Sequence, residues 1–151
     1  MNTQNISKEI KNLLEKQKFG VIATQGKDIP YTNLVAFFST DNMKNIVFAT
    51  SKKTEKYQNI LRNGKMSMLI DNCTNTPSDI ENAIVVSAFG SAHEIKQNKH
   101  DFIKKYEEKH PYLSDFVKSD DCALIIIKVQ YYQYIYKFKE IHLIDMTKNL
   151  L

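Results

Sequence analysis

The residues best suited to chemistry lie where a β-type run gives way to a helical pattern. Hydroxyl and lysine side chains gather at this point: Thr50, Ser51, Lys52, Lys53, Thr54 and Lys56. Free backbone N–H groups and the helix dipole favour an anion at a helix N-terminus. Hydroxyls and an ammonium group suit a phosphate dianion there. The sequence therefore predicts a phosphate-binding junction, although a capped surface helix with solvated lysines would show the same pattern.

Two apolar runs flank this junction and should hold it in place. They lie on either side of it, at residues 46–49 and 66–70. Between them Tyr57, Ile60 and Leu61 recur at helical spacing, which predicts a short helix that buries these side chains and turns Asn59 away. The pattern indicates a strand, a helix and a second strand in direct succession.

Two further helices are expected at the margins of the fold. In the first, which Asn5 or Ser7 would cap, four apolar residues follow helical spacing: Ile6, Ile10, Leu13 and Leu14. The second is capped near Asn98, ends before Pro111 and carries the apolar stripe of Phe102, Ile103 and Tyr106. The polar sides of both helices should face solvent.

The remaining periodic segments are β-type. They lie at residues 19–24, 29–38, 83–95, 122–138 and 141–144. An isolated Gly90 within one of them predicts a bulge or bend. Because six or seven strands occur without an alternating βαβ series, we expect an antiparallel barrel with peripheral helices.

The strand that begins at Tyr31 is largely apolar on both faces. By parity one face carries Tyr31, Asn33, Val35 and Phe37, and the other carries Thr32, Leu34, Ala36 and Phe38. A strand of this kind is covered on both sides. We expect the barrel interior on one side, and a helix or a partner subunit on the other.

Composition limits the class of protein. The 151 residues, 42% of them hydrophobic, fit a single domain over residues 1–151, and a net charge of +4 suits anionic ligands better than a nucleic-acid polymer. The two cysteines form no CxxC pair, which favours a reducing cytoplasm. With no signal-like start and no run of about 20 apolar residues, we expect no membrane association.

Other candidate sites give weaker patterns. No metal-ligand spacing connects the four histidines, His93, His100, His110 and His142, so no metal site is expected. No G-x-G-x-x-G or P-loop is present, and we assign no catalytic residue. The tyrosines at 132, 134 and 136 could stack nucleic-acid bases, but a barrel face or subunit interface is the favoured interpretation.

The order of these segments resembles that of the pyridoxamine 5′-phosphate oxidase-like flavin-binding split barrels, including their small general-stress and nitroimidazole-resistance members. It covers about residues 6–138, through GVIATQGKDIPYTNLVAF, NIVFATSKKTEKYQNILRNGKMSMLI, VVSAFGSAHEI and a helix ending in HPYL. Its most specific part is T-x-x-x-[ST]-x-K, formed by Thr50, Thr54 and Lys56. The resemblance implies a mainly β (α+β) fold, a six-stranded antiparallel split β-barrel with peripheral helices.

The resemblance also implies a cofactor and a set of binding residues. FMN would lie at the interface of a homodimer, its phosphate held by Thr50, Ser51, Thr54 and Lys56. The backbone of one strand would line the isoalloxazine ring, at Asn33, Leu34, Val35 and Ala36. The segment at Asn82 and Ala83 would stand near the flavin.

Departures from the family pattern affect the expected substrate. Asn33 and Phe38 stand where pyridoxamine phosphate oxidases carry an arginine and a lysine, and Glu55 stands beside the phosphate lysine in place of an arginine. The chain contains no Trp, so the C-terminal tryptophan motif is missing. We therefore expect the flavin site to be retained without oxidation of pyridoxamine phosphate.

The leading expectation is an FMN-dependent oxidoreductase. NAD(P)H or another flavin would reduce it, and a nitro compound, a quinone or a free flavin would be the small-molecule acceptor, because a flavin supplies hydride and electron transfer itself. The alternatives are a flavin-binding or redox-stress module without turnover, a haem-binding relative, and a relative that uses the deazaflavin F420.

Overall fold

The computed structural model describes residues 1–148. Its seven strands are β1 (Phe19–Gln25), β2 (Pro30–Ser39), β3 (Asn45–Ser51), β4 (Lys65–Asp71), β5 (Ile84–Glu94), β6 (Cys122–Tyr136) and β7 (Glu140–Asp145). Its helices are α1 (Thr3–Lys16), α2 (Glu55–Arg62), α3 (Asp79–Asn82), α4 (Lys99–Lys109), the 3-10 turn η1 (Pro111–Leu113) and α5 (Ser114–Lys118). The predicted single domain over 1–151 extends past the described residues and stays a prediction.

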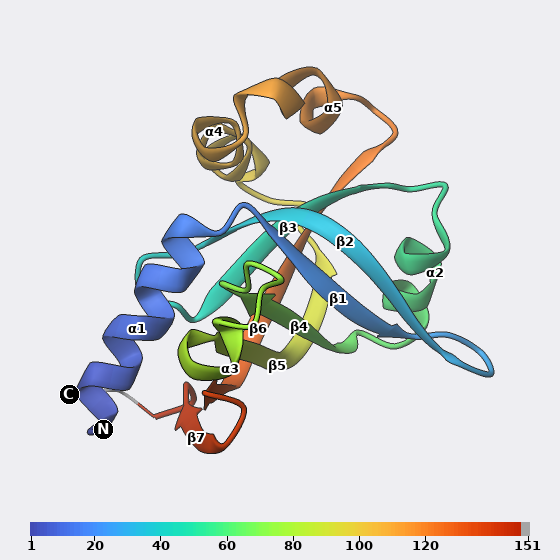
Figure 1. Cartoon of the computed structure of the whole chain (residues 1–151). Coiled ribbons are helices and arrows are strands. Elements are labelled where there is room, and N and C mark those ends of the chain that lie inside the picture. Colours follow the sequence, from blue (N-terminus) through green and yellow to red (C-terminus); the bar gives the residue numbers. More distant parts are fainter. Residues whose placement is uncertain (149–151) are drawn as a thin grey trace.

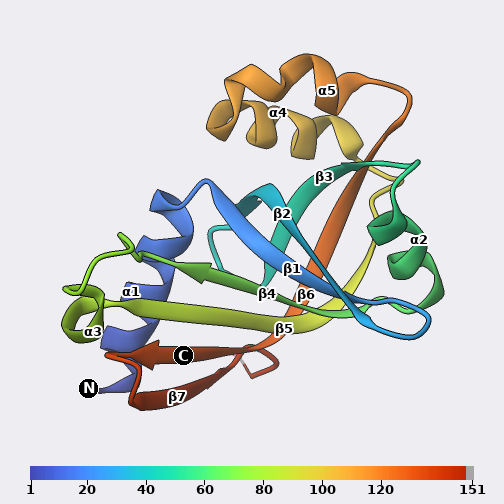
Figure 2. The same cartoon turned by 45° about the vertical axis from the view of Figure 1, so that its right-hand side comes forward.

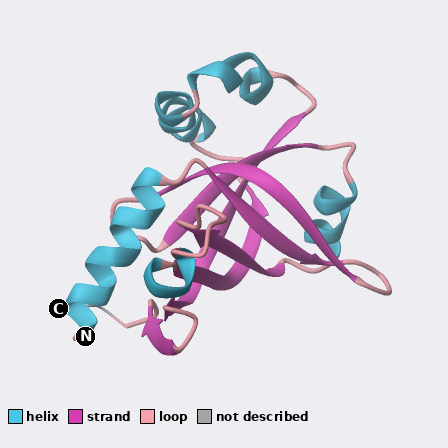
Figure 3. Cartoon of the chain, viewed as in Figure 1, coloured by secondary structure: helices cyan, strands magenta, loops and turns pink. Residues whose placement is uncertain are grey.

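The strands form one antiparallel sheet that closes on itself. Their order is β3-β2-β1-β4-β5-β6-β7, and β3 also pairs with the first half of β6. Six strands therefore make a closed barrel, while β7 pairs only with the second half of β6. Figure 1 shows the barrel with its helices around it, and Figure 3 separates the strands from the marginal helices by colour. The expected six-stranded split barrel is confirmed.

β2 has the two predicted covered faces only over residues 35–38, because the outer side of its first half is open and Leu34 is 68% exposed. Val35 and Phe37 belong to the large core inside the barrel, together with residues of all seven strands and α1. Ala36 and Phe38 belong to a second, smaller core between the outer side of the barrel and the α4–α5 segment. The barrel wall is thus sealed from both sides at residues 35–38 of β2.

Helices close both ends of the barrel (Figure 2). α1 buries Ile6, Ile10, Leu13 and Leu14, as its spacing predicted. Its cap is Asn2, whose side chain accepts a hydrogen bond from the Asn5 N–H, so the expected caps at Asn5 and Ser7 are wrong because the helix begins earlier. None of the helices within residues 1–148 combines the length and apolarity needed to cross a bilayer.

The predicted irregularity at Gly90 is a β-bulge in the pairing of β5 with β6. Phe89 pairs with Tyr131 and Gly90 with Val129, which leaves Gln130 as the extra residue. A Cβ atom on Gly90 would lie 2.0 Å from the Lys128 carbonyl oxygen, so only glycine fits. Beyond the bulge, the tyrosines at 132 and 134 are buried in the barrel core, where bases cannot stack on them.

Candidate functional site

A cavity of about 300 Å³ lies where β3 ends and α2 begins. Seven of the nine residues expected to bind a cofactor line it: Leu34, Val35, Ala36, Thr50, Ser51, Thr54 and Lys56. They come from the middle of β2, the end of β3 and the start of α2, which the barrel brings together. The remaining lining residues are Ala49, Tyr106, Leu113 and Phe116.

The strand–helix junction is built by local hydrogen bonds. Thr54 is the N-cap of α2, where its hydroxyl oxygen accepts from the Tyr57 N–H at 3.4 Å. The same hydroxyl donates to the Ser51 carbonyl at 2.8 Å and lies 3.1 Å from the hydroxyl of buried Thr50. These contacts fix the direction in which the helix leaves the strand, and hence the direction of its free N–H groups.

Lys56 is the charged group of this cavity. Its side chain is partly buried, and that burial lowers the pKa of its ammonium from the ordinary lysine value. No ion pair or side-chain hydrogen bond involves it among residues 1–148. The lost solvation of this cation is therefore uncompensated by an anion of the described chain.

The other charged residues of the junction are engaged elsewhere. Lys53 pairs with Asp121 at 2.9 Å, and this carboxylate raises the pKa of Lys53. Lys52 lies 3.9 Å from the Glu94 carboxylate, which also accepts a hydrogen bond from the Tyr57 hydroxyl at 2.8 Å. Only Lys56 is left to face the cavity, which the sequence pattern alone could not show.

The buried face of α2 differs from the predicted one. Ile60 is buried and Tyr57 partly buried, as expected, but Leu61 is 57% exposed and Asn59 is fully buried. The Asn59 amide donates to the Thr24 hydroxyl at 3.1 Å and accepts from the Arg62 guanidinium at 2.5 Å. These bonds satisfy the buried amide, so the prediction that Asn59 turns away is wrong.

One wall of the cavity comes from the helices before β6. Tyr106 of α4 is buried, Leu113 ends η1, and Phe116 of α5 is partly exposed beside the opening. Sequence reasoning assigned none of these three residues to the site, although it expected Tyr106 on a buried helix face. The apolar stripe of α4 indicated a buried face, but no local pattern says which strand that face covers.

The structure does not bring two of the expected residues into the cavity lining. Asn82 ends α3, its amide donates to the Ser78 carbonyl at 3.0 Å, and α2 and α3 lie at opposite ends of the barrel (Figures 1 and 2). Asn33 directly precedes Leu34, the first lining residue of β2. By strand alternation its side chain points to the opposite face of the strand from that of Leu34. Its Oδ1 atom is buried without a hydrogen-bond partner in the described part of the chain.

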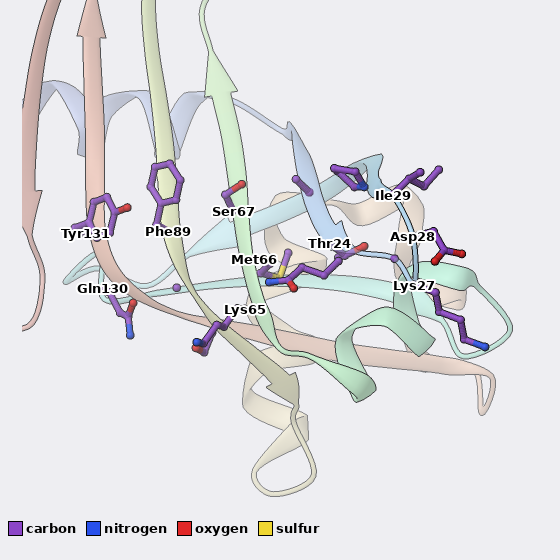
Figure 4. A pocket seen from close by; sticks show the side chains of 16 residues that line it. Thr24, Lys27, Asp28, Ile29, Lys65, Met66, Ser67, Phe89, Gln130 and Tyr131 are labelled. Carbon is purple, nitrogen blue, oxygen red and sulfur yellow. The ribbon is translucent and has the colours of Figure 1, made fainter.

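A larger open groove of about 730 Å³ lies on another face of the barrel. It runs between the β1–β2 hairpin and the outer sides of β4, β5 and β6. Figure 4 shows Phe89 and Tyr131 at one end and the hairpin residues Lys27, Asp28 and Ile29 at the other. The two aromatic rings stack at a centroid distance of 4.8 Å.

Solved structures share this fold at low sequence identity. "Heme binding protein from Mycobacterium smegmatis" matches with a TM-score of 0.82 at 12% identity, over 94% of this chain and 58% of that chain. Campylobacter jejuni ChuZ matches at 0.81 and 12%, over 100% and 67%. General Stress Protein 26 from Bacillus anthracis matches at 0.71 and 17%, over 93% and 98%. This chain thus spans little more than half of the mycobacterial protein.

Sequence comparisons show to which family the chain belongs. No curated protein matches the chain. The family pattern described as pyridoxamine 5′-phosphate oxidase matches residues 6–136, which is most of the sequence and includes β1 to β6. This match confirms the resemblance drawn from the order of the segments. The chain belongs to the pyridoxamine 5′-phosphate oxidase family.

Proposed function

We propose that this protein is an FMN-binding flavoprotein that passes hydride or electrons to a small acceptor, with NAD(P)H as the reductant. The observation that carries the proposal is the partly buried Lys56 at the start of α2, which has no partner within residues 1–148 and lies beside an apolar cavity. A ligand with a phosphate at one end and a flat apolar ring system at the other fits this combination. Family membership adds support, because it makes flavin binding the expected use of such a site.

The residues of the junction have separate roles in holding the phosphate. Lys56 would supply the opposing charge, and the hydroxyls of Thr50, Ser51 and Thr54 would donate or accept as the phosphate oxygens require. The backbone N–H groups of Glu55 and Lys56 have no acceptor within the described chain, so they are free to donate to an anion. Together these groups replace the water that the phosphate gives up.

The opposite part of the cavity suits the flavin ring. Leu34, Ala36 and Ala49 come from the barrel, and Leu113 and Phe116 from the η1–α5 segment. These side chains would bury ring surface and exclude water from it. The unpartnered Oδ1 of Asn33 is an acceptor close to the same strand segment. When bound, the flavin itself supplies the hydride or electron transfer, and the protein binds, orients and shields it.

The residues at the family's substrate positions argue against pyridoxamine phosphate as the acceptor. Phe38 is buried under α4 and α5, so it meets no substrate. Glu55 lies 3.8 Å from Arg62 and adds negative charge beside the site. Since Lys56 is the one cation among the described residues that line the cavity, a neutral or weakly charged acceptor fits best: a nitro compound, a quinone or a free flavin.

Two further properties belong to the proposal. We propose a homodimer with FMN at its interface, which the open side of the cavity at the 68% exposed Leu34 supports. We also propose a cytoplasmic location, with no membrane or nucleic-acid partner. The unpaired state of Cys73 and Cys122 suits a reducing compartment.

The visible absorption spectrum of the purified protein tests the proposal. We expect flavin bands, or their appearance when FMN is added at micromolar concentration, and NAD(P)H consumption once an acceptor is present. Riboflavin, which lacks the phosphate, is the matched control ligand and should bind more weakly than FMN. A colourless protein that takes up no FMN would refute the proposal, and a flavin-loaded protein without turnover would reduce it to a binding or redox-stress module.

The same spectrum separates the other cofactors. Haem would show a Soret band, and one structural neighbour that is named as heme binding makes it worth testing. However, no His, Cys or Met side chain lines the cavity among the described residues, so an iron ligand would have to be Tyr106 or Lys56. F420 would absorb at a different wavelength from FMN and is the remaining alternative.

A further inference from the structure

One polar side chain in the lining of the candidate cofactor cavity lies outside the phosphate-binding junction. Tyr106 of α4 lines the cavity although it is only 1% exposed. The hydroxyls of Thr50, Ser51 and Thr54 in the same lining take part in hydrogen bonds of the junction. The Tyr106 hydroxyl makes no hydrogen bond to any residue among 1–148, so it is left, like Lys56, to meet a ligand.

Two other buried tyrosines show how Tyr106 differs. The Tyr132 hydroxyl donates to the Met43 carbonyl at 2.8 Å. The Tyr134 oxygen has no partner, but atoms of the barrel core enclose it. The Tyr106 oxygen also lacks a partner within the described residues, yet it is not enclosed. Since Tyr106 lines the cavity, the cavity is the space to which this oxygen opens.

The polar groups beside Tyr106 are engaged with other partners. The His110 ring packs against the Tyr106 ring at a centroid distance of 4.9 Å, and its Nε2 atom lies 2.8 Å from the Phe37 carbonyl oxygen. The Cys122 thiol, which belongs to the same small core as Tyr106, donates to the Ala123 carbonyl at 3.7 Å. Neither side chain therefore serves the Tyr106 hydroxyl.

The hydroxyl adds nothing to the packing of α4. The Tyr106 ring belongs to the apolar core between the barrel and the α4–α5 segment, together with Ala36, Phe38 and Leu124. A phenylalanine ring would fill the same space, and a buried hydroxyl without a partner costs free energy. This cost is offset only when a ligand in the cavity supplies the partner.

Burial also decides in which direction such a hydrogen bond runs. It raises the pKa of the Tyr106 phenol above its ordinary value, so the hydroxyl keeps its proton near neutral pH and has an O–H group to donate. A flavin ring system carries carbonyl oxygens and ring nitrogens along one edge and is apolar along the other. A phenol donor matches the first of these edges.

We propose that Tyr106 is a ligand-recognising residue whose hydroxyl donates a hydrogen bond to the carbonyl-bearing edge of the bound flavin ring. Lys56 and Tyr106 come from α2 and α4, which lie over different parts of the barrel (Figures 1 and 2). The two residues therefore hold one ligand at two points, the phosphate at Lys56 and the ring at Tyr106. This inference rests on the proposed function and adds recognition of the ring to it.

Fluorescence titration of Tyr106→Phe with FMN and with riboflavin tests the proposal. Loss of one neutral hydrogen bond should weaken the binding of both ligands by the same factor, about fivefold. The absorption maximum of bound FMN should also shift, because a donor at the ring edge alters the electron distribution of the ring. Tyr112→Phe is the matched control, since Tyr112 is fully exposed on η1, and both of its affinities should stay native.

Stability and ligand choice separate this role from a structural one. Because no hydrogen bond within the described chain is lost, ligand-free Tyr106→Phe should unfold in urea at or above the native midpoint. A lower midpoint, or failure to fold, would show that the hydroxyl serves the fold and would overturn the proposal. Native affinity for both ligands, or weaker binding of FMN alone, would overturn it as well and leave FMN binding intact. A native protein that binds neither ligand would refute the proposed function, and the role of Tyr106 with it.

Discussion

The two helices that close the ends of the barrel do so in different ways. α1 places four aliphatic side chains in the main core, and none of its residues lines either of the two cavities described above. α2 is shorter, buries one aliphatic residue and one amide, and attaches through bonds from Asn59, Asn63 and Tyr57 to strands β1 and β5. One end is therefore sealed by apolar packing, and the other is held by polar contacts that leave Lys56 unpaired.

This difference separates stability from ligand binding. An apolar end gains its energy from burial and tolerates no ligand, whereas a polar end can exchange hydrogen bonds with a bound anion at little cost. Changes at α1 should consequently alter folding without altering cofactor affinity. Changes at the start of α2 should alter cofactor affinity without altering folding.

The largest effect is expected from Ile10→Ala at the apolar end. Ile10 is fully buried, so its truncation should lower the free energy of unfolding by about 2–5 kcal/mol. Urea denaturation measures the loss, with exposed Lys11→Ala as the control within about 0.5 kcal/mol of native. FMN affinity should not change in either variant, and a loss of affinity in Ile10→Ala would mean that the two ends are coupled.

Lys56→Ala should give the largest change in ligand affinity. Removal of the charge should weaken FMN binding by about 1.5–3 kcal/mol, the range of a hydrogen bond to a charged group. Riboflavin affinity should stay the same, and Lys53→Ala should bind FMN normally because Lys53 is paired with Asp121. Fluorescence titration distinguishes these cases, and equal FMN affinity in both lysine variants would remove the phosphate assignment.

Asn59→Ala tests whether polar contacts hold the second end. The change leaves the Thr24 hydroxyl and the Arg62 guanidinium without this partner, so unfolding should become easier by about 1–3 kcal/mol. Gln58→Ala, on the exposed neighbouring position, is the control. An unchanged denaturation midpoint for Asn59→Ala would show that the amide contributes nothing, as if it were exposed.

The smallest expected effect is a pH dependence at the C-terminus of α1. Lys109 donates to the Leu14 carbonyl at 2.8 Å, and burial lowers its pKa to about 8. Between that value and its ordinary 10.5, the unfolded chain binds more protons than the folded one, so this group makes stability rise with pH. The free energy of unfolding, measured with urea at pH 7 and at pH 9.5, should rise less between these two pH values in Lys109→Met than in the native protein. An identical rise would exclude Lys109 as its source.

Much of the architecture could be predicted from local patterns in the sequence. The two covered faces of β2 at residues 35–38, the start of a helix after β3, the bulge at Gly90 and the buried face of α1 all follow from residues close together in sequence. For the same reason the junction residues Thr50, Thr54 and Lys56 could be placed on one cavity. Family membership was also predictable, because it depends on the order of these local segments.

Features fixed by distant contacts could not be predicted. The burial of Asn59 depends on Thr24, 35 residues earlier, and no helical pattern shows that an amide has such a partner. Leu113 and Phe116 reach the cavity only because the α4–α5 segment folds over β2 and β3. Asn82 was expected near the flavin by family order; within one chain α3, which it ends, lies at the opposite end of the barrel from α2 (Figures 1 and 2), and its place near a flavin stays a prediction.

The bulge at Gln130 has a consequence for the whole C-terminal part of the chain. Before it, residues 122–128 of β6 pair with β3, and after it residues 131–136 pair with β7. The core side chains change parity at the same point, from Ile125 and Ile127 to Tyr132 and Tyr134. If Gln130 were instead paired in a regular ladder without the bulge, inside and outside would be exchanged along the rest of β6, bringing Tyr131 and Gln133 into the core and the two tyrosines into water. A single inserted residue thus decides which surface this protein shows to other molecules.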